Sequence, residues 1–246
     1  MPRVVNSSIV TTIDPVEPHT PGGVGAKLNR LRAAVLGAND GIVSIAALVV
    51  GIEGATDSTS AILTAGIAGV LAGALSMAAG EYVSVSSQRD SERALIEKER
   101  GELATRKVRE LEELTTLYEA KGLSPATAAT VARELTAHNA FAAHVEAELH
   151  LDPKKLARPW QSALASAGSF FAGAVLPMLA IIFPPPEWRI PVTFALVVVA
   201  LAITGSVSAY AGGANKTRAV IRVVLGGLIA MSITFAVGKA FNVTGI

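Results

Sequence analysis

Five long apolar stretches constrain the fold of this chain more than any other feature of its sequence. A transmembrane helix needs about 20 predominantly apolar residues, and four stretches meet that length outright. The fifth can be extended by basic residues at its ends, because long basic side chains reach back to the membrane surface. We therefore predict an all-α integral membrane protein with five transmembrane helices. The stretches are residues 33–52, 58–87, 159–186, 190–215 and 223–238.

Charged residues gather between the second and third stretches. Of the 41 Asp, Glu, Lys and Arg residues, 25 lie among the 71 residues from 88 to 158. This segregation predicts a polar insert between transmembrane helices 2 and 3, and its many Glu, Arg, Leu and Ala residues favour helix. The N-terminal residues are rich in proline and glycine and are predicted to form a disordered tail. The expected parts are the tail at 1–26, transmembrane helices 1–2 at 27–88, the insert at 89–158 and transmembrane helices 3–5 at 159–246.

Basic residues beside the spans predict the orientation in the membrane. Nine of them fall on one side of the predicted bilayer, whereas the opposite side has only Arg189 and Lys239. Loops rich in Lys and Arg stay in the cytoplasm, so the N-terminus and the insert are expected there and the C-terminus on the opposite side. The nine are Lys27, Arg30, Arg32, Lys154, Lys155, Arg158, Lys216, Arg218 and Arg222.

Composition excludes several classes of protein. A net charge of +1 argues against a strongly basic nucleic-acid binder, and 5% aromatic content argues against a base-stacking surface. The absence of cysteine excludes disulfides, thiolate zinc sites and cysteine nucleophiles. The predicted spans also contain no Ser–His pair, HExxH motif or paired catalytic aspartates. We expect neither an enzyme nor a nucleic-acid partner.

Three potential metal ligands lie at similar depth in the first two predicted spans. At 1.5 Å per residue, Asp40 lies about 10 Å from the cytoplasmic end of its helix, Glu81 about 9 Å and Met77 about 15 Å. A carboxylate inside a membrane is costly, which suggests a cation or a proton as its partner. A carboxylate oxygen with a thioether suits a borderline divalent ion. The alternatives are helix packing by Asp40, an interfacial position for Glu81 and core filling by Met77.

Four glutamates cluster in the insert, where residues 90–120 are predicted to be helical. On a continuous helix they project within an arc of about 80°. If Thr105 instead caps a new helix, the first pair can face the second across a hairpin. Either arrangement suggests bound divalent metal, because carboxylates without cations repel one another. The alternative is a solvated face with ion pairs such as Glu102–Arg106. The four are Glu99, Glu102, Glu110 and Glu113.

A second insert helix is expected after a stop at residues 121–125 and runs to about residue 150. Gly122 suits the position just after a helix, Ser124 an N-cap and Pro125 the first helical position. His144 and Glu148 are four residues apart on this helix and so share a face. That spacing can chelate a divalent ion, although it is common by chance.

Two stretches resemble motifs of the vacuolar iron transporter family. Residues 37–44 (GANDGIVS) resemble the motif of its first span, and residues 76–88 (SMAAGEYVSVSSQ) resemble the motif of its second. The five-span plan with a helical insert also matches, and the resemblance covers roughly residues 27–242. It implies a homodimeric exporter of cytosolic Fe²⁺, and often Mn²⁺, driven by proton antiport.

The resemblance also implies roles for individual residues. Asp40 and Met77 are similar to the pore metal ligands at the dimer axis. Five insert glutamates are similar to the ligands of a cytoplasmic metal-binding domain. Where eukaryotic members have methionines this chain has His144 and Val145, which makes the site less soft and adds His144 as a candidate ligand. The five glutamates are Glu99, Glu102, Glu110, Glu113 and Glu148.

We therefore expect a divalent-metal transporter that exports Fe²⁺ or Mn²⁺ from the cytoplasm, with Co²⁺ and Zn²⁺ as further candidates and no cofactor. Asp40 and Glu81 are the expected proton-coupling residues, because a carboxylate binds either a metal ion or a proton. With no organelle signal in the sequence, the expected location is the plasma membrane of a prokaryote, for a prokaryotic-type member of the family. The alternative is a non-transporting membrane scaffold, or a metal sensor, with a cytoplasmic helical domain.

Overall fold

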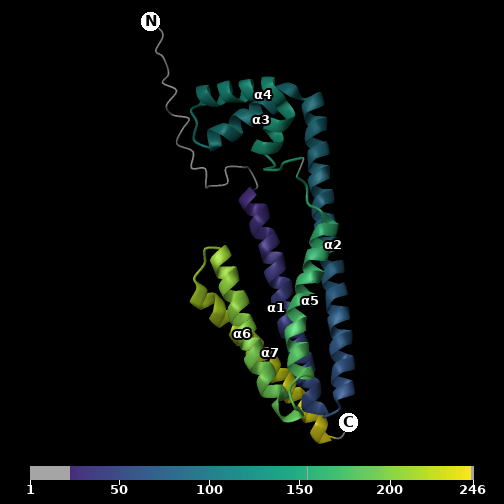
Figure 1. Cartoon of the computed structure of the whole chain (residues 1–246). Helices are drawn as coiled ribbons and strands as arrows, with labels where there is room; N and C mark the ends of the chain where they lie inside the picture. The colour runs from purple at the N-terminus through teal and green to yellow at the C-terminus, as the bar shows by residue number, and fades with distance from the viewer. Residues whose placement is uncertain (1–22, 154, 245–246) are drawn as a thin grey trace.

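The computed structural model describes the backbone of residues 23–244 except residue 154, and the side chains of residues 33–242 with the same exception. Residues 1–22 of the predicted tail lie outside this range. All regular elements in the described range are α-helices (Figure 1). They are α1 Gly23–Ala55, α2 Thr59–Thr105, α3 Lys107–Ala120, α4 Pro125–Ala147, α5 Pro159–Ile182, α6 Pro186–Ala211 and α7 Lys216–Thr244.

Five of these helices are long and apolar enough to cross a membrane, namely α1, α2, α5, α6 and α7. The prediction of an all-α membrane protein with five spans is thereby confirmed. The two remaining helices, α3 and α4, lie between the second and third of these spans along the chain. Figure 1 shows them beyond one end of α1, α5, α6 and α7, beside the end of α2.

Helix α2 belongs both to the membrane bundle and to the insert. It runs for 47 residues, or about 70 Å, from an N-cap at Ser58, whose hydroxyl accepts a hydrogen bond from the Ala61 amide. The helix predicted to start near residue 90 is therefore a continuation of the second span. It ends at Arg106, whose backbone (φ −132°, ψ 37°) is not helical. Helix α3 then begins, so residues 90–120 form two helices rather than one.

The insert closes on itself through the turn that the sequence predicts. Gly122 has a φ of +97°, which favours glycine, and the Ser124 hydroxyl caps α4 by accepting from the Thr127 amide. Helix α4 contains a break that the sequence analysis did not predict. Asn139 has an extended backbone (φ −163°, ψ 91°), and its side-chain oxygen accepts a hydrogen bond from the Ala142 amide. The break redirects the last turns of α4, which carry His144.

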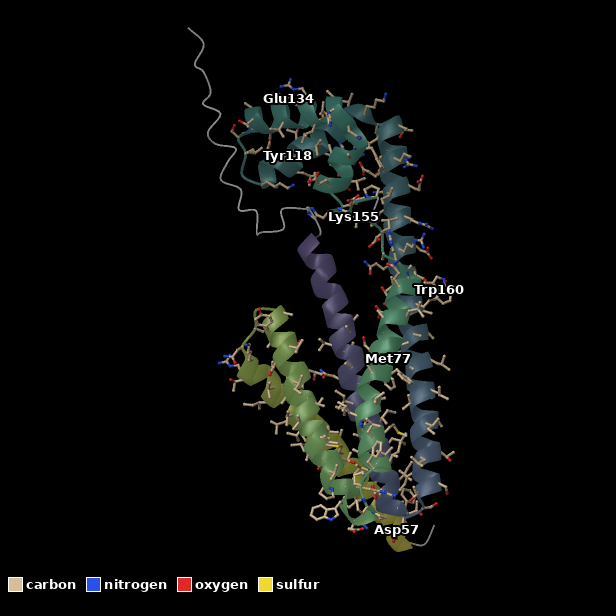
Figure 2. All side chains as sticks on the ribbon, viewed as in Figure 1. Asp57, Met77, Tyr118, Glu134, Lys155 and Trp160 are labelled. Atoms are coloured by element: carbon tan, nitrogen blue, oxygen red, sulfur yellow. The ribbon has the colours of Figure 1, made fainter. Side chains whose placement is uncertain are left out.

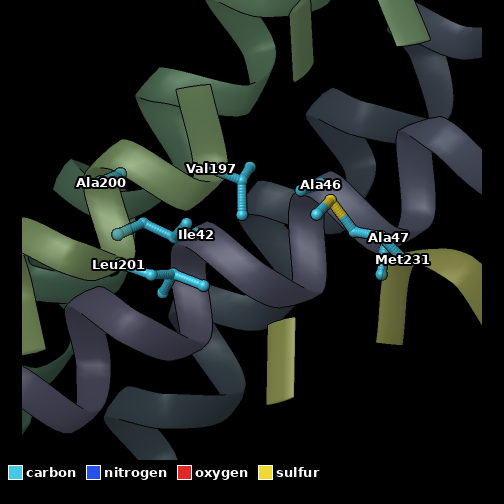
Figure 3. Packing of buried hydrophobic residues seen from close by; sticks show 7 residues of the cluster. All are labelled: Ile42, Ala46, Ala47, Val197, Ala200, Leu201 and Met231. Atoms are coloured by element: carbon cyan, nitrogen blue, oxygen red, sulfur yellow. The ribbon is translucent and has the colours of Figure 1, made fainter. Parts of the chain in front are cut away.

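Helix α1 is the centre of the membrane bundle. Its Ile42, Ala46 and Ala47 pack against residues of α6 and against Met231 of α7 (Figure 3). Glycines let its backbone approach two neighbours closely. A Cβ on Gly41 would lie 2.0 Å from the carbonyl oxygen of Phe170 in α5, and a Cβ on Gly238 in α7 would lie 1.9 Å from the Gly51 oxygen. Small residues are how membrane helices reach such contact.

Replacing Gly41 with alanine is therefore expected to destabilise the protein. Overpacking a tight contact costs roughly 1–3 kcal/mol, and here the obstacle is backbone rather than a flexible side chain. Gly80→Ala is the matched control, since a Cβ at Gly80 would meet no atom within 4 Å. Thermal unfolding in detergent should show a lower Tm for Gly41→Ala and an unchanged or higher Tm for Gly80→Ala. Equal Tm values would contradict the close crossing of α1 and α5.

Polar contacts join the helices at the end of the bundle opposite the insert. Arg189 of α6 is buried, and its Nη2 donates a hydrogen bond to the Thr59 hydroxyl of α2 at 3.0 Å. Glu53 of α1 is buried within range of the Arg189 charge. The Asn242 side chain of α7 donates to the Ala55 carbonyl at 2.7 Å. Toward the insert, by contrast, α6 and α7 diverge from α2 and α5 (Figure 1).

Candidate metal sites

The structure brings Asp40 and Met77 to one pocket in the membrane bundle. The pocket has a volume of about 360 Å³ and lies between α1 and α2, with Phe170 of α5 completing its wall. Gly69 and Gly73 of α2 also line it, and the lack of side chains there lets Leu48 of α1 and Phe170 of α5 pack closely against α2. Figure 2 labels Met77, midway along α2.

The chemistry of the pocket matches its candidate role. It is lined by Asp40, Met77, Ser44 and Ser76, whose side chains carry a carboxylate, a thioether and two hydroxyls. The Ser44 hydroxyl also donates to the Asp40 backbone carbonyl. Oxygen donors with one soft sulfur suit borderline divalent ions such as Fe²⁺. Of these four residues, the sequence analysis missed the two serines, because a hydroxyl in a membrane span more often bonds its own helix.

The Asp40 carboxylate is not used for helix packing within the described residues. The Ser44 hydroxyl bonds the backbone carbonyl of Asp40, not its carboxylate, and the Asn39 side chain accepts from Thr204 of α6. Asn39 and Ser44 are the neighbouring polar residues to which a packing carboxylate at position 40 could bond. Asp40 is instead exposed on the surface of the single chain.

Glu81 does not line this pocket. It lies one turn beyond Met77 on α2, on the insert side, and is half-buried. Its spacing of four residues puts it on the same face as Met77. Glu81 therefore lies on the same side of α2 as Met77, one turn nearer the insert.

A second group of ligands lies in the insert. Glu99 of α2, His144 of α4 and Glu148 just after α4 each offer a ligand atom, and these three atoms lie within 4.8 Å of one another. The His144 Nδ1 lies 3.0 Å from Glu99 Oε1 and 3.9 Å from Glu110 Oε2 of α3. Glu99, Glu110 and His144 are buried. Three helices thus converge on one carboxylate–imidazole cluster.

Several buried polar atoms of this cluster make no well-formed hydrogen bond within the described residues, although two of them, Glu99 Oε1 and His144 Nδ1, lie 3.0 Å apart. The atoms are Glu99 Oε1, Glu148 Oε2 and both ring nitrogens of His144. Buried polar atoms in native proteins nearly always form good hydrogen bonds, so four buried ligand atoms that face one another without them make a candidate site for a cation. Carboxylates with an imidazole suit Fe²⁺, Mn²⁺ or Zn²⁺.

Burial, reinforced by the negative charges of Glu148, Glu110 and Glu102, raises the pKa of Glu99 to about 7. The metal-free cluster therefore holds a proton on Glu99 at mildly acidic pH. A divalent cation reverses this balance because it neutralises the repulsion between the carboxylates.

The two other predicted glutamates lie differently. Glu102 is half-buried and forms ion pairs with Lys98 and Arg106, each at 3.3 Å. For this residue the structure agrees with the alternative, in which the glutamate forms ion pairs on its own helix. Glu113 is exposed on α3 and is absent from the cluster of ligand atoms among the described residues. The structure thus assembles Glu99, Glu110 and Glu148 with His144, and separates Glu113 from them.

The sequence analysis did not single out Glu53, and it used Arg189 only to predict the orientation. Glu53 is one residue beyond the first apolar stretch as delimited there, yet it lies inside the span Ala33–Ala55 and is buried. The sequence did offer a signal for Glu53, because apolar or small residues flank it on both sides, at 51–52 and 54–55.

The fold and the two groups of candidate ligands define a polytopic helical membrane protein with carboxylate-containing sites suited to cations. Residues 31–239 match the VIT family, and the chain belongs to that family. The family resemblance of residues 37–44 and 76–88 is thereby confirmed.

Its relatives carry the family name. The chain is 44% identical over 209 residues to "Vacuolar iron transporter" of Acanthamoeba castellanii, which covers 85% of this chain and 77% of that protein. It is 38% identical over 233 residues to "Vacuolar iron transporter homolog 1" of Oryza sativa subsp. japonica, covering 93% and 82%. It is likewise 38% identical over 241 residues to homolog 5 of the same plant, covering 94% and 92%.

Proposed function

We propose that this chain transports a divalent metal ion, Fe²⁺ or Mn²⁺, out of the cytoplasm in exchange for protons. One observation carries the proposal: the Asp40 carboxylate and the Met77 thioether line the same pocket between two membrane-spanning helices. A scaffold has no need of such a pocket. Relatives named vacuolar iron transporters, at up to 44% identity over most of the chain, support iron as the ion.

The exchange follows from the chemistry of a carboxylate, which binds either a metal ion or a proton. Asp40 holds the ion in the pocket, and protonation of Asp40 from the acidic side releases it. Glu81, one turn nearer the insert, takes part in the transfer of protons. The shape of the bundle supports entry from the insert side, since the helices diverge there and polar contacts join them at the opposite end (Figure 1).

The insert faces the cytoplasm in this proposal, as the distribution of basic residues around the spans indicates. Glu99, Glu148 and His144, with Glu110 beside them, capture the cytosolic ion before it enters the membrane. The proposed location is the plasma membrane of a prokaryote, although the relatives' names refer to vacuoles.

We further propose a homodimer whose pore lies between two copies of α1. Asp40 and Leu36, one turn apart on α1, are exposed, whereas Ile42, Ile45 and Val49 of the same helix are buried. A carboxylate facing lipid costs about 2.5–3.5 kcal/mol at a helix centre, so a second copy stabilises this face by covering it. Two Asp40 residues then share one ion near the two-fold axis.

The dimer is tested by a cysteine at position 36, in a chain that has no cysteine of its own. Leu36→Cys is expected to cross-link between two copies in the bilayer. Ile203→Cys, at an equally exposed site on α6, is the control and is expected to remain uncross-linked. A protein that transports metal yet never cross-links at position 36 would contradict the shared pore.

Transport itself is tested by metal flux into sealed vesicles that contain the purified protein. Fe²⁺, Mn²⁺, Co²⁺ and Zn²⁺ are compared side by side, with and without a pH gradient. We expect saturable uptake that the gradient accelerates. A scaffold or sensor would bind metal at the insert and give no flux above that of empty vesicles, and this result would overturn the proposal.

A further inference from the structure

A second pocket, also of about 360 Å³, lies where the insert meets the membrane bundle. Two of its walls come from α2 and from the segment that connects α4 to α5, and the first turn of α5 forms the third. Neither the metal pocket nor the insert cluster shares a residue with it.

Three arginines supply the charge of this pocket. Arg89 and Arg93 are four residues apart on α2 and so share a face, and Arg158 precedes α5. No carboxylate lines the pocket, and within the described residues none of the three guanidinium groups forms an ion pair. Other basic residues of the insert do form such pairs, as Arg100 does with Glu97 at 3.0 Å. The three unpaired arginines give this pocket a positive charge that attracts an anion.

The start of α5 adds donors to the same pocket. Its N-cap residue Arg158 makes no side-chain capping bond, and Pro159 at the first position has no N–H. The amides of Trp160 and Gln161, both of which line the pocket, are therefore first-turn donors without a capping side chain. The N-terminus of a long helix favours phosphate through these amides and its dipole.

Aromatic residues mark the level of the pocket relative to the membrane. The rings of Tyr82 and Trp160 lie 4.8 Å apart, and Trp160 is 68% exposed. Trp and Tyr gather at the boundary between lipid and water, and Arg89 is the first basic residue after the apolar part of α2. Figure 2 labels Trp160 between Met77 and Lys155, where the long helices meet the insert. The pocket therefore lies at the depth of the lipid headgroups.

We propose that this pocket binds the phosphate of an anionic phospholipid headgroup. Guanidinium groups bind phosphate through paired hydrogen bonds, and basic pockets beside membrane helices are suited to anionic headgroups. Pro153, Leu156 and Ala157 form an apolar wall that suits the glycerol end of a lipid better than a free ion. The bound lipid ties α2 to the connection that leads from the insert into α5.

The test measures retention of phosphatidylglycerol by the full-length protein. The protein is purified from vesicles of phosphatidylcholine with a minor share of phosphatidylglycerol, and bound lipid is counted by native mass spectrometry. The variant Arg89→Gln/Arg93→Gln/Arg158→Gln is expected to lose about a hundredfold or more in affinity for phosphatidylglycerol, since each charge-assisted contact accounts for about tenfold.

The matched control is Lys216→Gln/Arg218→Gln/Arg222→Gln. It removes the same charge from exposed residues at the start of α7 that line neither described pocket. It should retain the lipid as the unaltered protein does. Equal loss in both variants would show attraction by general surface charge and overturn the proposal, as would full retention in both.

A further arm separates lipid from free phosphate. Inorganic phosphate is titrated into the protein in pure phosphatidylcholine vesicles, and binding as tight as that of phosphatidylglycerol would overturn the assignment to a lipid. If the triple variant does not fold, Arg93→Gln alone, at an exposed side chain, is expected to weaken retention about tenfold. Unchanged retention in that folded variant would likewise overturn the proposal.

Discussion

Replacing Asp40 with asparagine is expected to abolish metal flux while the protein still folds. The amide keeps the shape of the side chain but removes the negative charge that holds a divalent ion or a proton. Insertion does not suffer, because a neutral amide costs less in a membrane than a carboxylate. Mutation of residues that only support a metal ligand typically lowers metal affinity or activity about 10–100-fold. Loss of the ligand itself should therefore lower flux by more than about a hundredfold.

The measurement is flux into vesicles, divided by the amount of folded protein, with proton movement followed in parallel. Metal and proton movement should disappear together, because one carboxylate serves both ions. Asp57→Asn is the control, since Asp57 is exposed in the connection between α1 and α2 and does not line the pocket. Normal flux per folded Asp40→Asn molecule would end the proposed mechanism, and poor folding with normal flux would identify Asp40 as a packing residue.

Removing two carboxylates from the insert cluster is expected to abolish its metal binding. Glu99→Gln/Glu148→Gln retains the size of both side chains but leaves a divalent ion only His144 and Glu110. We expect Mn²⁺ affinity at the insert to fall by about a hundredfold or more. Glu113→Gln is the discriminating control, because Glu113 is exposed and lies outside the cluster, and it should bind as the unaltered protein does.

Calorimetry with the full-length protein provides the measurement, and an Asp40→Asn background removes the membrane site from the titration. If Glu113→Gln weakened metal binding as much as the double variant does, Glu113 would belong to the ligand set, and the cluster described above would be wrong. The affinity should also rise about tenfold between pH 6 and pH 8. The pKa of Glu99 is raised to about 7, so below that pH a proton must leave before the metal binds, and above it none is held.

The membrane part of the fold was predictable because the bilayer leaves the chain few choices. A span must be helical and apolar over about 20 residues, so the five stretches define five helices without any knowledge of their packing. The turn of the insert was predictable for a similar reason. Glycine is favoured just after the end of a helix and serine at the N-cap of the next, and Gly122 and Ser124 occupy these two positions. These signals are local, and the structure confirms them.

The cluster in the insert could be predicted only in part, because its geometry depends on two breaks in the helices. The sequence raised the first of them, near Thr105, only as an alternative, and did not indicate the second. Arg106 is an ordinary helix former, yet the helix ends there, and the residues after it no longer follow the angular phase of those before it. Glu110 therefore meets Glu99, whereas Glu113 turns to solvent. The break at Asn139 likewise sets the direction of the turns that carry His144.

The continuity of α2 makes it a rigid connection between the two candidate metal sites. Met77 and Glu99 are 22 residues apart on this one helix, which corresponds to about 33 Å of rigid rod. A tilt of about 10° at the membrane pocket displaces Glu99 by roughly 6 Å. That displacement exceeds the 4.8 Å within which Glu99, His144 and Glu148 hold their ligand atoms. We therefore expect movement of the bundle and assembly of the insert cluster to be mechanically linked through α2.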